Sequence, residues 1–228
     1  MNTSKLSLPL LFALLVCSGP GHADSVAQLL KNVLPASCNF SSDFVQNKTI
    51  SAIPKPISSS GQLLFSCNHG LIWQTQQPIT DILIYNHRNI QLKSIDGSRY
   101  LTLNDIRHQQ IAKLLISLMQ ADTETLLADF IVEDLSQVPA TSLSLTPKNA
   151  MAKKSIDTIV LTKDPQTDML EIVINNANRQ TIQLLINNNQ TYANLNREQY
   201  SHTCKNTLAL PKACDVILNP DFYSAGTP

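Results

Sequence analysis

The sequence lacks an excess of charge of either sign, with 17 Lys and Arg against 17 Asp and Glu in 228 residues. It also lacks any run of basic residues. A protein that binds nucleic acid or an anionic membrane surface needs clustered Lys and Arg to replace the counterions of phosphate groups. The composition therefore argues against both kinds of partner.

Recognisable catalytic motifs are also missing. The sequence has no Gly-x-Ser-x-Gly element, no His-Glu-x-x-His pair and no glycine-rich phosphate loop. Four histidines stand without a Ser, Cys or Asp at a useful spacing, so we expect them on the surface: His69, His87, His108 and His202. An enzyme acting on a lipid stays an alternative, because active sites can assemble from distant residues. We nevertheless expect no catalytic role, no cofactor and no metal.

The N-terminal segment has the order of a secretory signal. Lys5 precedes an apolar run over residues 6–16, and small residues follow up to Ala23. The run of about eleven residues is too short for a bilayer, which needs roughly twenty, and no later segment is apolar enough to cross one. We expect cleavage after Ala23, which makes residues 1–23 a signal peptide. Lipidation of Cys17 is the alternative, but a lipobox requires a small residue before the cysteine and this chain has a valine there.

Four cysteines follow the signal peptide, Cys38, Cys67, Cys204 and Cys214. An even number in an oxidising compartment indicates disulfides. Three pairings are possible, and we favour Cys38 with Cys67 and Cys204 with Cys214, because each pair joins neighbouring segments. A metal site fits worse, because the histidines beside these cysteines do not stand at the usual ligand spacings.

About 205 residues remain after the signal peptide, which suits one domain with a substantial core. Hydrophobic periodicity predicts a helix over residues 24–34 and then several antiparallel strands within residues 40–95, separated by turn residues. Two helices follow, over residues 103–119 and 124–130, and strands return within residues 141–188.

Eight or so strands in two groups, with helices between the groups, predict an α+β fold. The sheet would curl into an incomplete antiparallel β-barrel, and the inserted helices would cover its open side. If the apolar layers of sheet and helices pack fully against each other, the result is an ordinary core. If they stay apart, the result is an apolar cavity, and periodicity alone leaves both outcomes open.

The order of these segments resembles that of the periplasmic carriers of outer-membrane lipoproteins, the LolA-like family. Phe44-Val45-Gln46 looks like the family's opening strand. The stretch "SSGQLLFSCNHGLIWQTQQP" resembles the family's signature of glycine, apolar strand, tryptophan and proline, here Gly61, Phe65, Trp73 and Pro78.

The second half of the chain continues this resemblance. "LSLTPK", residues 143–148, is similar to the segment that opens the second half of the family's sheet, and the strand-turn-strand pattern after it ends in polar asparagines. The resemblance covers roughly residues 26–190. We therefore divide the mature chain into a LolA-like half-barrel domain over residues 24–200 and a cysteine-containing C-terminal tail over residues 201–228.

The resemblance implies a carrier and not a catalyst. Proteins of this fold hold acyl chains between a half-open β-barrel and an α-helical lid and move an amphiphile across the periplasm. Apolar contacts suffice for such binding, because each methylene kept out of water is worth about 0.8 kcal/mol. The side chains expected to line the apolar cavity are Leu63, Phe65, Leu71, Trp73, Ile82, Ile84, Ile111, Leu115, Leu118 and Met119.

The resemblance also implies partners, namely an acylated lipoprotein or lipid as cargo, with an inner-membrane donor complex and an outer-membrane acceptor. We expect a monomer that binds no nucleic acid. In the best-known lipoprotein carriers an arginine on the strand before the Trp hairpin holds the lid closed, and Cys67 stands at that position here. The alternative is a periplasmic protein-interaction or sensor module, which would use the same half-barrel without lipid cargo.

Overall fold

The computed structural model describes residues 22–86, 91–95, 97–103, 106–193 and 195–221, with the backbone alone for residues 22–25, 91 and 106–112. Residues 1–21 of the predicted signal peptide, including Cys17, lie outside the described residues. His87 lies outside them too.

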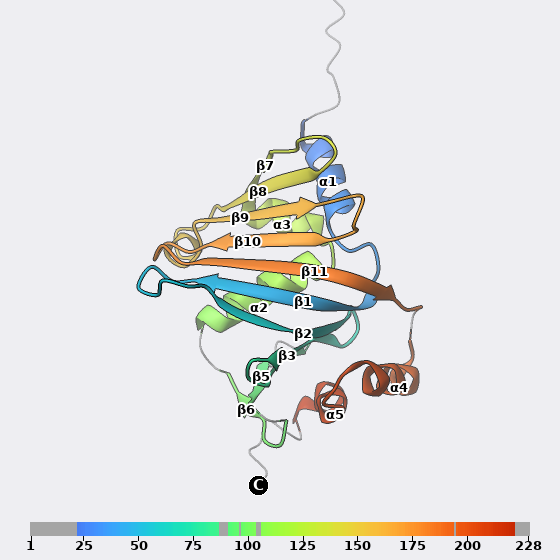
Figure 1. Cartoon of the computed structure of the whole chain (residues 1–228). Helices are drawn as coiled ribbons and strands as arrows, with labels where there is room; N and C mark the ends of the chain where they lie inside the picture. Colours follow the sequence, from blue (N-terminus) through green and yellow to red (C-terminus); the bar gives the residue numbers. More distant parts are fainter. Residues whose placement is uncertain (1–21, 87–90, 96, 104–105, 194, 222–228) are drawn as a thin grey trace, which may run out of the picture.

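Eleven strands form one sheet in the order β6-β5-β4-β3-β2-β1-β11-β10-β9-β8-β7 (Figure 1). All neighbouring strands are antiparallel. The edge strands β6 and β7 do not pair with each other, so the sheet is open. In chain order the strands are β1 (Asn39–Thr49), β2 (Ile57–Ser66), β3 (Gly70–Gln77), β4 (Asp81–Asn86), β5 (Gln91–Ser94), β6 (Leu101–Thr102), β7 (Phe130–Asp134), β8 (Thr141–Pro147), β9 (Thr158–Lys163), β10 (Leu170–Asn175) and β11 (Thr181–Thr191).

Two helices connect the opposite edges of this sheet. The chain leaves β6, forms α2 (Ile106–Met119) and α3 (Thr123–Asp129), and re-enters the sheet at β7. Figure 1 shows both helices behind the sheet. The prediction of an α+β fold with an open antiparallel sheet and inserted helices is confirmed.

Both faces of the sheet carry apolar clusters, because successive side chains of a strand point to opposite faces. The inner face, which bears Phe65, packs against α1 (His22–Val33), α2 and α3. The outer face, which bears Leu64, packs over β2–β5 against α4 (Arg197–Thr207) and α5 (Lys212–Leu218). One half of the sheet is therefore buried on both sides.

The C-terminal helices and the two edge strands, β6 and β7, were not expected from the sequence. The tail is polar, and α4 buries only Tyr200 and Cys204, so its apolar stripe is too narrow to register as helical periodicity. Its start is nevertheless encoded, because Asn196 and Gln199 form a capping box. The edge strand β7 begins at Phe130, which the sequence analysis had assigned to the preceding helix. The predicted division at residue 200 is not tested, and α4 spans that position.

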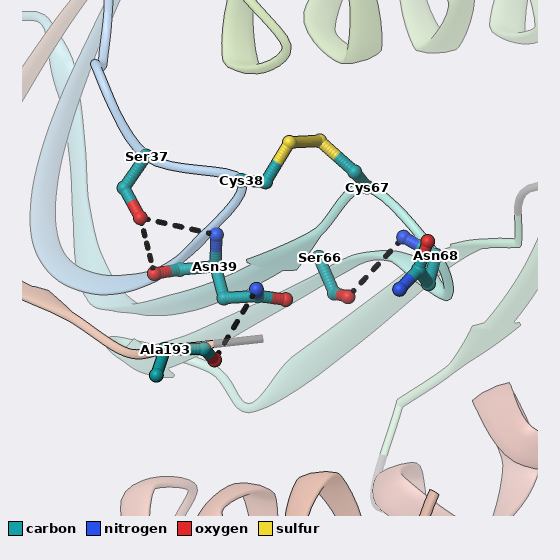
Figure 2. Close-up of a disulfide and its surroundings, with 7 residues drawn as sticks. All are labelled: Ser37, Cys38, Asn39, Ser66, Cys67, Asn68 and Ala193. Carbon is teal, nitrogen blue, oxygen red and sulfur yellow. Dashed lines mark hydrogen bonds between the residues drawn. A yellow bond between two sulfur atoms is a disulfide. The ribbon is translucent and has the colours of Figure 1, made fainter. Parts of the chain in front are cut away.

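Both predicted disulfides are confirmed, Cys38–Cys67 and Cys204–Cys214. The first ties the segment before β1 to the end of β2, as Figure 2 shows. The Cys67 amide also donates to the Cys38 carbonyl at 2.8 Å, and the Asn39 side chain donates to the carbonyl of Ala193 at 3.5 Å. The start of β1 is thus attached to β2 on one side and to the segment after β11 on the other.

Gly61 provides a test of the sheet's packing. A Cβ at this position would lie 2.0 Å from the backbone oxygen of Gln74 on β3, so β2 and β3 would have to separate. We expect Gly61→Ala to lower the free energy of unfolding by about 2 kcal/mol or more, measured by urea denaturation. Ser60→Ala is the control on the same strand and should stay within about 0.5 kcal/mol of the wild type. Equal stability of the two variants would contradict this account.

Candidate functional site

Two aromatic pairs occupy the centre of the inner face. Phe40 lies opposite Phe65, and their ring centroids are 5.5 Å apart. Phe44 lies opposite Gly61, which has no side chain, and its ring packs against Trp73 on β3 at 4.1 Å. The absence of a side chain at Gly61 therefore lets an aromatic contact reach across an intervening strand.

The inner face is filled by the helices that cover it. Leu118 of α2 is 0% exposed, and so is Phe65 beneath it in the same cluster, while Trp73 is 8% exposed. Leu114 of α2 and Leu126 of α3 join this cluster. In this conformation the two apolar layers pack against each other as a core.

The structure brings together six of the ten predicted cavity residues and leaves the rest elsewhere. Leu115 packs at the border of the inner cluster, and the side chain of Ile111 lies outside the described part of α2. Ile82 and Ile84 lie on the outer face instead, against the C-terminal helices. The six residues in the inner cluster are Leu63, Phe65, Leu71, Trp73, Leu118 and Met119.

The position of Ile82 and Ile84 follows from the register of β3 and β4. Trp73 pairs with Leu83 and Leu71 pairs with Tyr85, so these two partners share the inner face. A shift of one residue moves a strand's apolar set to the other face. Without the register, the apolar run of β4 did not reveal which residues face inward, and Leu83 and Tyr85 were missed.

A pocket of about 230 Å³ opens at the margin of the inner cluster. It lies between α2, α3, the start of β7 and the segment before β9, which contains the 3-10 helix η1 (Ala152–Lys154). Three of its lining residues belong to the inner cluster, so its floor continues the buried apolar layer. These are Leu114, Leu126 and Ile156. The sequence analysis did not find this pocket, because it joins segments that are distant in the chain.

The size of the pocket limits what it holds when the helices are closed. Sites for small molecules usually measure about 300–1,000 Å³, and a cavity of about 150 Å³ is enough for benzene. The pocket of about 230 Å³ therefore accommodates only part of an acyl chain. A longer chain requires α2 and α3 to move away from the sheet.

The contacts at the mouth of the pocket are weak and exposed. The Nζ atom of Lys113 on α2 lies 3.1 Å from Oδ2 of Asp129 at the end of α3, and these side chains are 68% and 50% exposed. Such surface ion pairs contribute about 0–1 kcal/mol. Lys148 donates a hydrogen bond to the carbonyl of Leu127 at 2.6 Å. The first contact joins α2 to α3, and the second joins α3 to the segment after β8.

The histidines form no reactive or metal-binding group in the described residues, where no cluster of three His, Cys, Asp or Glu could hold a metal ion. His69 is half-buried, and its ring packs 4.3 Å from that of Tyr200 on α4. His202 is exposed and contacts Asn206. The side chain of His108 lies outside the described residues. Within the described chain, no helix has the length and apolarity that a bilayer crossing requires.

Comparison with known protein families identifies one that matches most of the chain. The model of the family described as "Outer membrane lipoprotein carrier protein LolA" matches residues 37–203. This family is a carrier and binding fold and not a family of enzymes, in agreement with the expected lack of a catalytic role. A search of curated proteins found no match.

Several solved structures are similar to the chain at low sequence identity. The LolA superfamily protein NE2245 from Nitrosomonas europaea is 11% identical with a TM-score of 0.45, over 78% of this chain and 96% of that one. A putative outer membrane lipoprotein-sorting protein domain from Vibrio parahaemolyticus is 9% identical with a TM-score of 0.43, over 78% and 96% of the two chains. MucB is 17% identical with a TM-score of 0.37, over 79% and 63%.

The start of α3 provides a test of the helical cover. Asp122 caps this helix by accepting a hydrogen bond from the Thr125 amide at 3.0 Å, and the hydrogen bonds from Thr125 lower the pKa of Asp122 below its ordinary value of 3.8. We expect Asp122→Ala to weaken α3 by about 1 kcal/mol and to speed the hydrogen exchange of its amides about fivefold. Glu124→Ala, in the first turn of the same helix, is the control.

The same cap predicts a pH dependence with a definite sign. Because the folded pKa of Asp122 is lowered, its stabilisation is fully present above the unfolded pKa and is lost as pH falls through the folded pKa. The protection factors of the α3 amides in the wild type, which correct for the intrinsic exchange rate at each pH, should therefore fall below about pH 4. In Asp122→Asn, which keeps a capping oxygen without a titrating group, this fall should be absent. Identical pH profiles would contradict the capping role.

Proposed function

Because the chain belongs to the family of the outer membrane lipoprotein carrier protein LolA, we propose that it is a periplasmic carrier of acylated molecules. It shields the acyl chains of a lipoprotein or another lipid during transfer toward the outer membrane. The observation that carries this proposal is the apolar layer between the inner face and α2–α3, which continues into a pocket at its margin. The two disulfides support an oxidising compartment.

Binding proceeds by exchange of one apolar partner for another. When α2 and α3 move away, the inner face loses contacts with Leu118 and Met119, and an acyl chain takes their place. Each methylene that leaves water contributes about 0.8 kcal/mol, but the displaced helix surface offsets part of this gain. The net affinity is therefore moderate, and re-closure of the helices expels the cargo without any further chemistry.

The proposed cargo surface lies on one face of the sheet. Ile82 and Ile84 are left out, because α4 and α5 cover them on the outer face. Leu115 and Ile111 are kept as proposed cargo contacts. Leu115 lies on α2 at the border of the inner cluster, and Ile111 lies on the same helix about one turn before Leu115. An inner-membrane donor and an outer-membrane acceptor are part of the same proposal, since a carrier exchanges cargo at both membranes.

A second candidate is a protein-interaction module with the same fold and no lipid cargo. The observation that favours it is the packing of the C-terminal half of α2 into the inner cluster, where Leu118 and Phe65 are fully buried. In such a module the helices stay closed and a partner contacts the outside of the molecule. Opening of α2 and α3 in the presence of an acyl chain separates the two candidates.

Filling the pocket tests the carrier proposal. Ala152 on η1 lines the pocket, and a phenyl group in its place would fill space that an acyl chain would otherwise occupy. Excluding about two methylenes of the chain would cost about 1.6 kcal/mol. We expect Ala152→Phe to weaken the binding of a fluorescent fatty-acid probe about tenfold, measured by titration. Native mass spectrometry of the wild type purified from periplasm should also show a co-purifying acylated ligand.

A matched control keeps this test specific. Lys154→Phe adds the same side chain to the same 3-10 helix at an exposed position outside the pocket lining, and its affinity for the probe should equal that of the wild type. Equal weakening in both variants would point to a general effect of the added ring. A wild type that is repeatedly isolated without ligand and ignores acyl probes would rule out the carrier proposal and favour the interaction module.

A further inference from the structure

The edge strand β7 (Phe130–Asp134) has one strand neighbour in the described structure. It pairs with β8 and stands at the end of the strand order, next to α1 in the view of Figure 1. The Leu135 amide donates to the Ser142 carbonyl at 2.8 Å, and the Lys148 amide donates to the Asp129 carbonyl at 2.9 Å. The odd-numbered residues of β7 are therefore the ones whose backbone groups bond to β8.

The intervening residues direct their backbone groups away from the sheet. In an antiparallel ladder, residues alternate between those that bond to one neighbour and those that face the other side. Val132 and Asp134 thus present N–H and C=O groups at the open edge. Such an edge is a template for an added strand, which supplies main-chain hydrogen bonds to it.

The side chains of this edge carry a distinct pattern on the outer face. Phe130 and Val132 pack toward the inner cluster, so their neighbours in the strand face outward. Ile131 and Leu135 are each 49% exposed, and the exposed Glu133 stands between them. The edge therefore offers an apolar–acidic–apolar row at every second position. Val138, in the turn that follows, is fully exposed.

The surrounding charge is acidic. Residues 114–147 contain no Lys or Arg. Lys113, just before this range, pairs with Asp129. Glu133 and Asp134 give β7 itself a local negative charge, whereas the chain as a whole is neutral. The acidic residues of the range are Asp122, Glu124, Asp129, Glu133 and Asp134.

We propose that β7 is a docking edge for an extended segment of a partner protein that carries a basic residue between two apolar residues at every second position. Such a segment adds a twelfth strand antiparallel to β7, places its basic side chain opposite Glu133 and covers Ile131 and Leu135. Cross-strand pairs of this kind contribute about 0.2–1 kcal/mol each, and the main-chain bonds supply the remainder. The edge does not depend on what the pocket binds.

A second copy of the chain is a poor occupant of this edge. Two β7 strands in antiparallel contact centred on Glu133 or on Asp134 would bring that carboxylate against the same carboxylate of the other molecule. Like charges on neighbouring strands are destabilising. The acidic residues thus disfavour self-association through β7 and favour a basic partner, which is how edge strands are commonly kept from aggregating.

Two synthetic peptides test the proposal. In both peptides threonine alternates with three residues whose side chains would lie on the same face as Ile131, Glu133 and Leu135. In the lysine peptide these three residues are valine, lysine and valine. The glutamate peptide has glutamate in place of the lysine. We expect the wild type to bind the lysine peptide about tenfold more tightly, measured by NMR titration at low salt. The amides of Val132 and Asp134 should become protected from hydrogen exchange on binding.

Variants of the edge make the test specific. Glu133→Lys should reverse the preference between the two peptides, whereas Glu198→Lys, the same charge change at an exposed position on α4, should leave it unchanged. Val132→Pro removes an outward N–H and should abolish binding of both peptides, while Val132→Ala should retain it. If Val132→Pro fails to fold, the charge reversal at Glu133 alone decides the question.

The contrary results are equally definite. Equal affinity for the two peptides, no binding of either, or an unchanged preference in Glu133→Lys would overturn the docking edge. A loss of acyl binding in Ala152→Phe with normal peptide binding would show that pocket and edge act independently. The peptide-binding experiments therefore test the docking edge even if the carrier proposal fails.

Discussion

The connection between the two edges of the sheet is the constraint on which the rest of the structure depends. β1 and β11 lie side by side in the middle of the strand order. The first half of the chain adds strands from β1 outward to the edge strand β6, and the second half adds strands from the other edge, β7, inward to β11. The chain leaves the sheet at β6 and returns at β7, the opposite edge, and the connection has to pass over one face. Because α2 and α3 form this connection, a helical cover over the inner face is a consequence of topology.

The same topology leaves the two faces of the sheet covered by different elements. Over β2–β5 the outer face is sealed by α4 and α5, which a disulfide joins to each other. The inner face is covered by α2 and α3 through apolar packing, and an exposed ion pair joins these two helices to each other. Under the carrier proposal, α2 and α3 are therefore the elements that move away from the sheet, while α4 and α5 stay in place.

Sequence reasoning reached the architecture because its signals are local. Alternation with turn residues marked most strands, and helical spacing marked α2 and α3. The register between β3 and β4 depends on the turn that joins them, and so Ile82 and Ile84 were assigned to the wrong face. The pocket could not be predicted either, because Leu114 and Ile156 are distant in the chain and line it together only in the folded structure.

The pairing of the cysteines has a consequence for how the chain matures. Cys38 pairs with the next cysteine in the chain, 29 residues later, and Cys204 pairs with the next one, 10 residues later. A polypeptide that is threaded through a membrane from its N-terminus exposes its thiols in this same order. For an exported chain, as proposed above, oxidation in this order yields the native bonds. The first bond fastens β1 to β2 while β11, the other neighbour of β1, has still to emerge.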